Sequence, residues 1–338
     1  MSDNDFTQWV AKLPKAELHI HIDGSLQAAR MLSLAKKNNV SLPYKTEADI
    51  SAAYNFVDLQ SFLDLYYLGA SVLRDEEDFY HLMMDYLIRC REENVLHTEI
   101  MVEPQTYFPY DVSFATMMNG FLAAINEAEK EWGQSVGLIL SVLRHLSEQE
   151  AIATLIAAEP YREHFVAVGI ASSESGNPPE KFTEFYRLAK ERGYMRTAHA
   201  GEEGPAEYIW NSLDVLDVQR IDHGVRCVED EKLVTHLIDK KIPLTVCPLS
   251  NIKLCVFDNM TQHNILQLLD RGVMVTVNSD DPTYFGGFLS DNFVALHNDL
   301  QLTKAQAIQL AKNSFNASFL PQVKKDLFVQ RINQYEAE

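Results

Sequence analysis

Four short segments of the sequence combine histidine and acidic residues in ways that could bind a metal ion or move a proton. In the first, His19-Ile20-His21, two histidines are separated by one residue. In an extended strand both would face the same side, so their imidazoles can reach one ion. The other segments are His199-Ala200-Gly201-Glu202, Asp222-His223-Gly224 and Ser279-Asp280-Asp281-Pro282. Each segment alone also has an ordinary explanation, such as a half-buried strand histidine, a solvated loop acid or an Asp-Pro turn.

The positions of these segments relative to predicted strands favour a shared site. Strands rich in Val, Ile and Leu, without clean alternation, are typical of sheets buried on both faces. We expect such strands at 17–23, 97–102, 137–143, 166–171, 196–199, 220–223, 243–247 and 273–278. The histidine and acidic segments then follow or end strands one, five, six and eight. The C-terminal ends of parallel strands form the rim where barrel enzymes build their active sites, so this coincidence favours one site.

Helical patterns alternate with the predicted strands. Capping boxes at Ser147-x-x-Glu150 and Thr303-x-x-Gln306 mark two helix starts. Alternation of this kind requires right-handed parallel crossovers, and eight units favour a closed (β/α)8 TIM barrel, an α/β fold, over an open sheet. Residues 24–94 hold several helical patterns and predict a helical insertion after strand one, placed as a lid. Extra helices follow Asp281, and we expect one domain over 1–338.

Composition limits the partners of the chain. Its 338 residues are 46% hydrophobic, and 48 acidic against 29 basic residues give a net charge of −19. Nucleic acids and anionic membranes attract basic surfaces, so neither is expected as a partner, whereas a small neutral ligand is compatible. The exposed helices of a barrel are compatible with a homo-oligomer.

The cysteines and the N-terminal sequence indicate the cellular compartment in which the protein is expected. The four cysteines form no C-x-x-C pair, which excludes a disulfide framework or a cysteine-based zinc site of that kind. The N-terminal residues are acidic and polar, unlike a secretory signal, and no apolar run reaches the roughly 20 residues of a membrane span. We therefore expect a cytoplasmic protein.

The candidate ligands indicate metal-assisted hydrolysis. His19, His21, His199 and one of the two acids at 280 and 281 form a set of three imidazoles and a carboxylate that suits Zn²⁺ with one position open for water. Such an ion lowers the pKa of its water towards ~7. Glu202, close by but outside the ligand set, is a candidate to carry the proton. The strand predicted at 166–171 lacks the lysine that bridges many two-metal amidohydrolase sites, so we expect one zinc ion per chain.

In their order and spacing, four motifs of the sequence resemble the adenosine/adenine deaminase branch of the amidohydrolase superfamily. They are H-x-H-x-D-G at 19–24, H-A-G-E at 199–202, D-H-G at 222–224 and S-D-D-P at 279–282. The resemblance runs nearly end to end and implies that His19, His21, His199 and Asp280 bind Zn²⁺. It further implies that Glu202 donates a proton to purine N1 as water attacks C6. His223 would orient or deprotonate that water, and Asp281 would hydrogen-bond N7. Ammonia is then lost.

The resemblance is compatible with two classes of substrate, free adenine and its substituted forms. Residues 247–254 and 276–286 look like bacterial adenine deaminases, and Ser172-Ser173-Glu174 stands where adenosine enzymes carry Gly-Asp-Glu. That loop lies near the purine edge facing the sugar, so we expect Ser172 and Ser173 to contact the substrate. The change favours free adenine, converted to hypoxanthine in purine salvage. Asp23 is the residue usual in adenosine deaminases, where it reaches a ribose hydroxyl. Adenosine and N6-substituted adenine are therefore the alternatives.

Two further alternatives lie outside this branch of the family or outside catalysis. A related mononuclear enzyme could act on another amine-bearing heterocycle. A metal-binding barrel without catalysis should lack the residues that carry protons, yet Glu202 and His223 are both present. The sequence therefore favours an enzyme.

Overall fold

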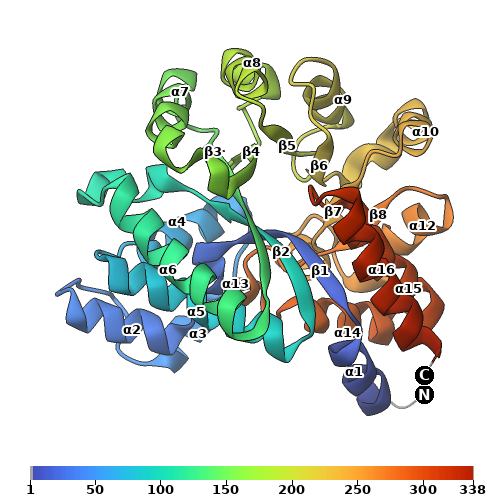
Figure 1. Cartoon of the computed structure of the whole chain (residues 1–338), viewed down its shortest axis with the longest axis horizontal. Helices are drawn as coiled ribbons and strands as arrows, with labels where there is room; N and C mark the ends of the chain where they lie inside the picture. The colour runs from blue at the N-terminus through green and yellow to red at the C-terminus, as the bar shows by residue number, and fades with distance from the viewer. Residues whose placement is uncertain (1–2, 338) are drawn as a thin grey trace.

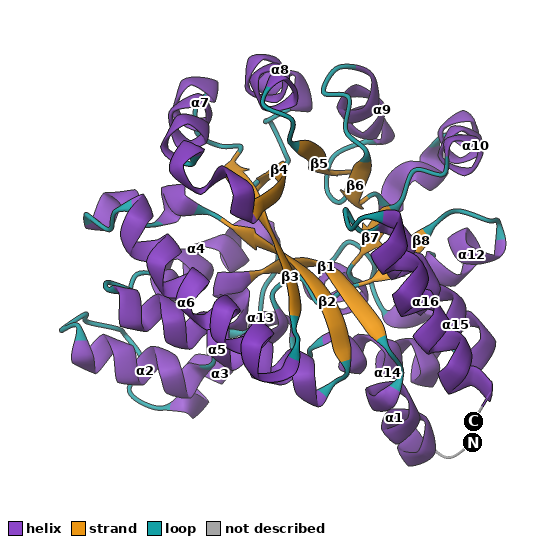
Figure 2. Ribbon diagram, viewed as in Figure 1, coloured by secondary structure: helices purple, strands orange, loops and turns teal. Residues whose placement is uncertain are grey.

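A barrel of parallel strands, ringed by helices, forms the centre of the molecule (Figures 1 and 2). The computed structural model describes residues 3–337 and orders its eight strands as in the sequence. These are β1 (Lys15–His21), β2 (Val95–Val102), β3 (Ser135–Leu143), β4 (Phe165–Ala171), β5 (Met195–Ala200), β6 (Arg220–His223), β7 (Leu244–Val246) and β8 (Val275–Val277). All eight predicted strands and the TIM barrel are confirmed. The first strand was predicted to continue to residue 23, but it ends at His21 because residues 22–25 form a 3₁₀ helix.

The barrel closes between its last and first strands. Asp280 pairs with Ile20 in a parallel bridge, and the His21 N–H donates to the Asp280 carbonyl at 3.0 Å. The Asp280 N–H donates to the His19 carbonyl at 3.1 Å. Nearer the N-terminal end of β1, the Leu18 N–H donates to the side-chain oxygen of Asn278 at 2.8 Å. An asparagine side chain thus replaces a backbone acceptor where β8 is only three residues long.

The helices between the strands complete the repeating unit. They include α5 (Glu76–Glu92), α6 (Phe114–Trp132), α7 (Glu148–Ala157), α8 (Thr183–Glu191), α9 (Ala206–Asp214), α10 (Glu231–Lys240), α11 (Pro248–Lys253) and α12 (Ile265–Asp270). Both predicted capping boxes are present, with Ser147 and Thr303 accepting the N–H of the residue three positions on. These reciprocal bonds satisfy N–H groups that a helix start leaves unpaired, which fixes where each helix begins.

Further helices lie before, within and after the series of strands and connecting helices (Figure 1). The predicted insertion contains α2 (Ala28–Lys37), α3 (Glu47–Ala53) and α4 (Leu59–Ala70), whereas α5 belongs to the barrel ring. After β8 come the short α13 (Pro282–Phe285), then α14 (Leu289–Leu300), α15 (Lys304–Ala317) and α16 (Gln322–Ala337). The N-terminal α1 (Asp3–Lys12) was not predicted; it meets α16, where Tyr335 donates to the Trp9 carbonyl at 2.8 Å. Between residues 3 and 337, every helix is too short or too polar to cross a membrane.

The barrel interior contains a buried ion pair as well as apolar side chains. Arg220 on β6 donates to Glu99 on β2 at 2.6 Å, and both residues are fully buried. His97 lies 3.2 Å from the other Glu99 oxygen. Burial alone would raise the pKa of Glu99, but the charges of Arg220 and His97 outweigh it and lower the pKa to about 2. The pair therefore ties opposite walls of the barrel together only while Glu99 is ionised.

Replacing this acid tests that role. Glu99→Gln leaves Arg220 buried without its counter-charge, and we expect the free energy of unfolding at pH 7 to fall by about 3 kcal/mol. Because the folded pKa is below the unfolded one, the stabilisation is complete above about pH 4.5 and is lost as the pH falls towards 2. Urea unfolding between pH 3 and 7 measures both effects. An unchanged free energy of unfolding in Glu99→Gln would contradict this role.

Candidate metal centre and catalytic site

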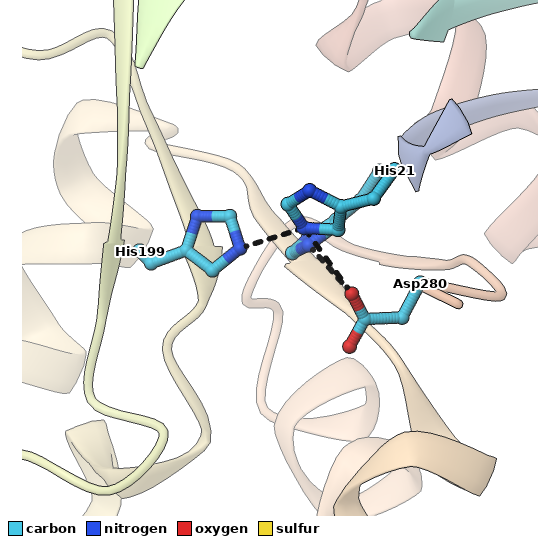
Figure 3. A group of neighbouring side chains, drawn as sticks. His21, His199 and Asp280 are labelled. Atoms are coloured by element: carbon cyan, nitrogen blue, oxygen red, sulfur yellow. Dashed lines mark hydrogen bonds and ion pairs between the residues drawn. The ribbon is translucent and has the colours of Figure 1, made fainter. Parts of the chain in front are cut away.

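The four predicted metal ligands meet at the C-terminal end of the barrel. One ligand atom from each of His19, His21, His199 and Asp280 lies within 4.8 Å of the others, and all four residues are buried. The Nε2 atoms of His21 and His199 are 3.2 Å apart, and Asp280 Oδ1 is 3.4 Å from His21 Nε2. Figure 3 shows these side chains converging from β1, β5 and the end of β8.

The chemistry of this group fits a divalent ion. His19 Nε2 is buried with no hydrogen-bond partner among residues 3–337, although it lies 3.3 Å from Asp280 Oδ1. A buried nitrogen without a partner is costly unless something absent from the protein chain satisfies it. Three imidazoles and one carboxylate are ligands that suit several first-row divalent metals. The group could therefore bind one metal ion.

Hydrogen bonds behind the histidines fix their orientation. Glu103 Oε1 lies 2.8 Å from His21 Nδ1, and Thr245 Oγ1 lies 3.0 Å from His19 Nδ1. Thr245 in turn donates to Asp222 at 2.9 Å. Such contacts hold the opposite ring nitrogen of each histidine towards the metal position. The sequence analysis missed Glu103 and Thr245. Glu103 directly follows the predicted second strand, so the strand-end rule that located the histidines applies to it too.

Three non-glycine residues at the rim adopt left-handed backbone conformations. Ser172, His223 and Asp280 have φ values of 77°, 64° and 63°. Each such residue costs on the order of 1–3 kcal/mol unless its surroundings hold it, and such strain clusters at functional sites. The strained positions follow or end β4, β6 and β8. In each case the strand turns sharply where a predicted site residue stands.

Glu202 and His223 form the predicted proton-carrying pair. Glu202 Oε2 lies 3.5 Å from His223 Nε2, which is 3.8 Å from Asp280 Oδ2. Burial and the negative charges of Asp280 and Glu174 raise the pKa of Glu202 well above its usual range. Burial and the nearby His19 lower the pKa of His223 to about 3. These shifts favour the protonated form of Glu202 and the neutral form of His223, an acid beside a base.

A second acid holds the loop that carries Glu202. The Glu174 carboxylate accepts four backbone N–H groups, those of Gly201 (2.7 Å), Glu202 (3.1 Å), Glu203 (2.9 Å) and Gly204 (2.8 Å). Glu174 is itself buried. Hydrogen bonds to a charged acceptor are about twice as strong as neutral ones, so this contact fixes the turn after β5.

A pocket above the metal centre is closed by the helical insertion. Its walls include Glu202, His223, Asp280, Asp281 and Ser172 from the rim. Its apolar lining is Leu59, Phe62, Leu63, Tyr66 and Tyr67 from α4, with Leu143, Ala171, Leu254 and Phe285 from the barrel side. The predicted lid is therefore α4, whose apolar side chains cover the polar rim. This arrangement suits a flat, largely apolar ligand with polar edges.

The remaining predicted substrate contacts differ in position. Asp281 lines the pocket, and burial together with the Asp280 and Glu103 charges raises its pKa well above the usual range. Ser172 lines it too, and its hydroxyl lies 3.1 Å from the Tyr67 hydroxyl. Ser173 is not among the lining residues. Asp23, also outside the lining, accepts hydrogen bonds from Tyr66 at 3.3 Å and from Tyr107.

Comparison with known proteins assigns the family. The family model described as adenosine deaminase matches residues 14–335, nearly the whole chain. The chain belongs to the adenosine deaminase family. It is 55% identical to a protein of Hahella chejuensis named adenine deaminase, over 96% of this chain and 97% of that protein.

Solved structures agree with this assignment. The crystal structure of adenine deaminase from Arthrobacter aurescens superposes with a TM-score of 0.94, at 42% identity, and covers 96% of this chain and all of that one. An amidohydrolase from Burkholderia ambifaria, solved with bound Zn, has a TM-score of 0.90 at 24% identity, covering 100% of this chain and 94% of that one. The second likeness shows the shared fold alone.

Removing one ligand tests the metal centre. Wild-type protein loaded with excess divalent metal and then desalted should retain about one ion per chain, and chelation should lower its Tm because the ion binds only the folded state. Asp280→Asn removes a charged ligand, so retained metal should fall at least tenfold and the Tm should become insensitive to chelator. Elemental analysis and thermal unfolding measure these effects. Asp258→Asn, an exposed acid, is the matched control. Full occupancy in Asp280→Asn would contradict the assignment.

Proposed function

We propose that this chain hydrolyses adenine to hypoxanthine and ammonia, with one Zn²⁺ per chain held by His19, His21, His199 and Asp280. The observation that carries the proposal is the convergence of Glu202 and His223 with this ligand group in one buried pocket. The 55% identity to a protein named adenine deaminase supports the substrate. The reaction would place the chain in purine salvage.

The pocket provides acid and base on either side of the reacting carbon. A bound Zn²⁺ supplies the Lewis acidity that makes water nucleophilic near neutral pH. The protonated carboxyl of Glu202 donates to ring N1, which relieves the negative charge that develops there as C6 is attacked. The neutral imidazole of His223 accepts a proton from the attacking water. The protonated Asp281 donates to N7 and fixes the plane of the ring. The exocyclic amine takes up the proton that His223 accepted, the C6–N bond breaks, and the amine leaves as ammonia.

Apolar side chains around the pocket, most of them from the lid helix α4, would add to the binding of the purine ring. Leu63 and Phe62 of α4 and Phe285 of α13 line the pocket, and apolar side chains of this kind pack well against the faces of a purine ring. They also exclude bulk water, which strengthens the interactions of Glu202 and Asp281 with the ring.

Adenosine is the second candidate, because Asp23 matches the acid that adenosine enzymes use. Two observations favour the free base instead. Asp23 is occupied by hydrogen bonds from Tyr66 and Tyr107 and is not among the lining residues. Ser172 in turn hydrogen-bonds Tyr67 of the lid. Contacts across this side of the pocket leave less room for a sugar.

Ammonia release from adenine and adenosine by the zinc-loaded protein tests the proposal. We expect kcat/KM for adenine to exceed that for adenosine by at least ~10²-fold, the scale on which a pocket rejects a group it cannot accommodate. Faster turnover of adenosine would overturn the substrate assignment. Inactivity on every 6-aminopurine would overturn the deaminase assignment itself.

A conservative substitution tests the proton donor. Glu202→Gln keeps the shape of the side chain but cannot supply the proton, so kcat should fall by ~10²–10⁴-fold while metal content stays unchanged. Glu203→Gln is the matched control, because its side chain is not among those lining the pocket. Wild-type turnover in Glu202→Gln would show that another group protonates the ring.

A further inference from the structure

Four carboxylates line the pocket, and three of them each have one buried oxygen with no hydrogen-bond partner within residues 3–337. These atoms are Glu202 Oε1, Asp281 Oδ1 and Glu103 Oε2. A buried, unpaired carboxylate oxygen costs free energy, so such atoms are expected to meet polar groups of a ligand. The proposed reaction uses Glu202 and Asp281 but gives the free oxygen of Glu103 nothing to bind.

Glu103 is held firmly in the wall of the pocket. It directly follows β2, which pairs with β1 so that His21 lies opposite Met101. One of its oxygens, Oε1, lies 2.8 Å from His21 Nδ1, and the residue is only 2% exposed. The side chain therefore has one fixed oxygen and one oxygen left for a donor. As an ionised carboxylate it can only accept hydrogen bonds.

The order of the strands indicates which part of a purine faces Glu103. Glu202 follows β5 and Asp281 follows β8, and they flank the reacting carbon at N1 and N7 in the proposed function. A ring held at these two points turns C6 towards the arc of the rim from β5 to β8, which includes His199 and His223. Its N3–N9 edge then faces the remaining arc, from β1 to β4. Glu103 stands on that arc, at the end of β2.

The substituent at N9, on this edge of the ring, distinguishes a free base from a nucleoside. Free adenine carries an N–H at N9, whereas a nucleoside or nucleotide carries its sugar there. We propose that Glu103 Oε2 accepts the N9–H of the free base and thereby makes the site reject N9-substituted purines. This inference rests on the proposed function. The three unpaired oxygens then correspond to three polar positions of adenine, at N1, N7 and N9.

Neighbouring groups cannot replace Glu103 in this contact. Asp23 is a buried acid close enough to Glu103 for their charges to interact, but its two oxygens accept hydrogen bonds from Tyr107 and Tyr66. An N9 substituent would leave Glu103 Oε2 without a donor and would have to fit against it. Sites built to hydrogen-bond a substrate N–H reject analogues without it far more strongly than apolar pockets reject an extra methyl group.

Comparing adenine with 9-methyladenine tests the proposal. For the wild type, kcat/KM should favour adenine by at least ~10³-fold. In Glu103→Gln, an amide oxygen can still face His21 while an NH₂ group replaces the free acceptor, so this ratio should fall to about tenfold or less. The ratio is measured within one protein preparation, so any change in metal loading cancels. Glu203→Gln, outside the pocket lining, is the matched control and should keep the wild-type ratio.

Product binding gives a readout that needs no turnover. By calorimetry, metal-loaded wild type should bind hypoxanthine at least ~10²-fold more tightly than 9-methylhypoxanthine, and Glu103→Gln should bind the two within tenfold. A wild type that treats N9–H and N9-methyl compounds alike, or a Glu103→Gln variant that keeps the full preference, would overturn the role of Glu103. Absence of adenine turnover would instead overturn the proposed function, while the binding comparison would still test Glu103.

Discussion

Closure of the barrel between β1 and β8 is the constraint on which the site depends. The two backbone hydrogen bonds between Asp280 and β1 place the carboxylate of Asp280 beside the imidazoles of His19 and His21. Asp280, which is 261 positions from His19 and 259 from His21 in the sequence, thereby joins them in one group. Glu17 reinforces the junction, because its carboxylate accepts the N–H and the hydroxyl of Ser279 at 2.9 and 2.6 Å. The strained conformation of Asp280 persists because these contacts hold it on both sides.

The same principle recurs around the rim, where buried acids hold the parts that carry chemistry. The Glu174 carboxylate accepts backbone N–H groups of the turn after β5, and the Glu103 carboxylate orients His21. The density of carboxylates in this small volume is costly without cations or donors. In the proposed reaction a divalent ion, a proton on Glu202 and the donors of a purine ring would each offset part of that cost. The same buried acids would then serve both substrate binding and catalysis.

Much of the fold was predictable because its determinants are local. Strands buried on both faces have a distinctive composition, and capping boxes such as those of Ser147 and Thr303 fix helix starts within a few residues. The grouping of His19, His21, His199 and Asp280 was predictable because strand ends in a barrel share one rim. Glu103 follows a predicted strand, but neither a histidine nor a second acid stands beside it in the sequence. Thr245 was missed because its importance lies in a contact with a histidine on another strand, which no local pattern records. The hydrogen bonds that occupy Asp23 were missed for the same reason, since Tyr66 and Tyr107 lie 43 and 84 positions away.

A crystal structure of the zinc-loaded protein with hypoxanthine bound tests the proposed site most directly. We expect one ion on His19, His21, His199 and Asp280. We also expect the six-membered ring of the product to meet Glu202 at N1, under the apolar face of α4. An ion on a different set of residues, or a product ring bound away from Glu202, would contradict the proposed site.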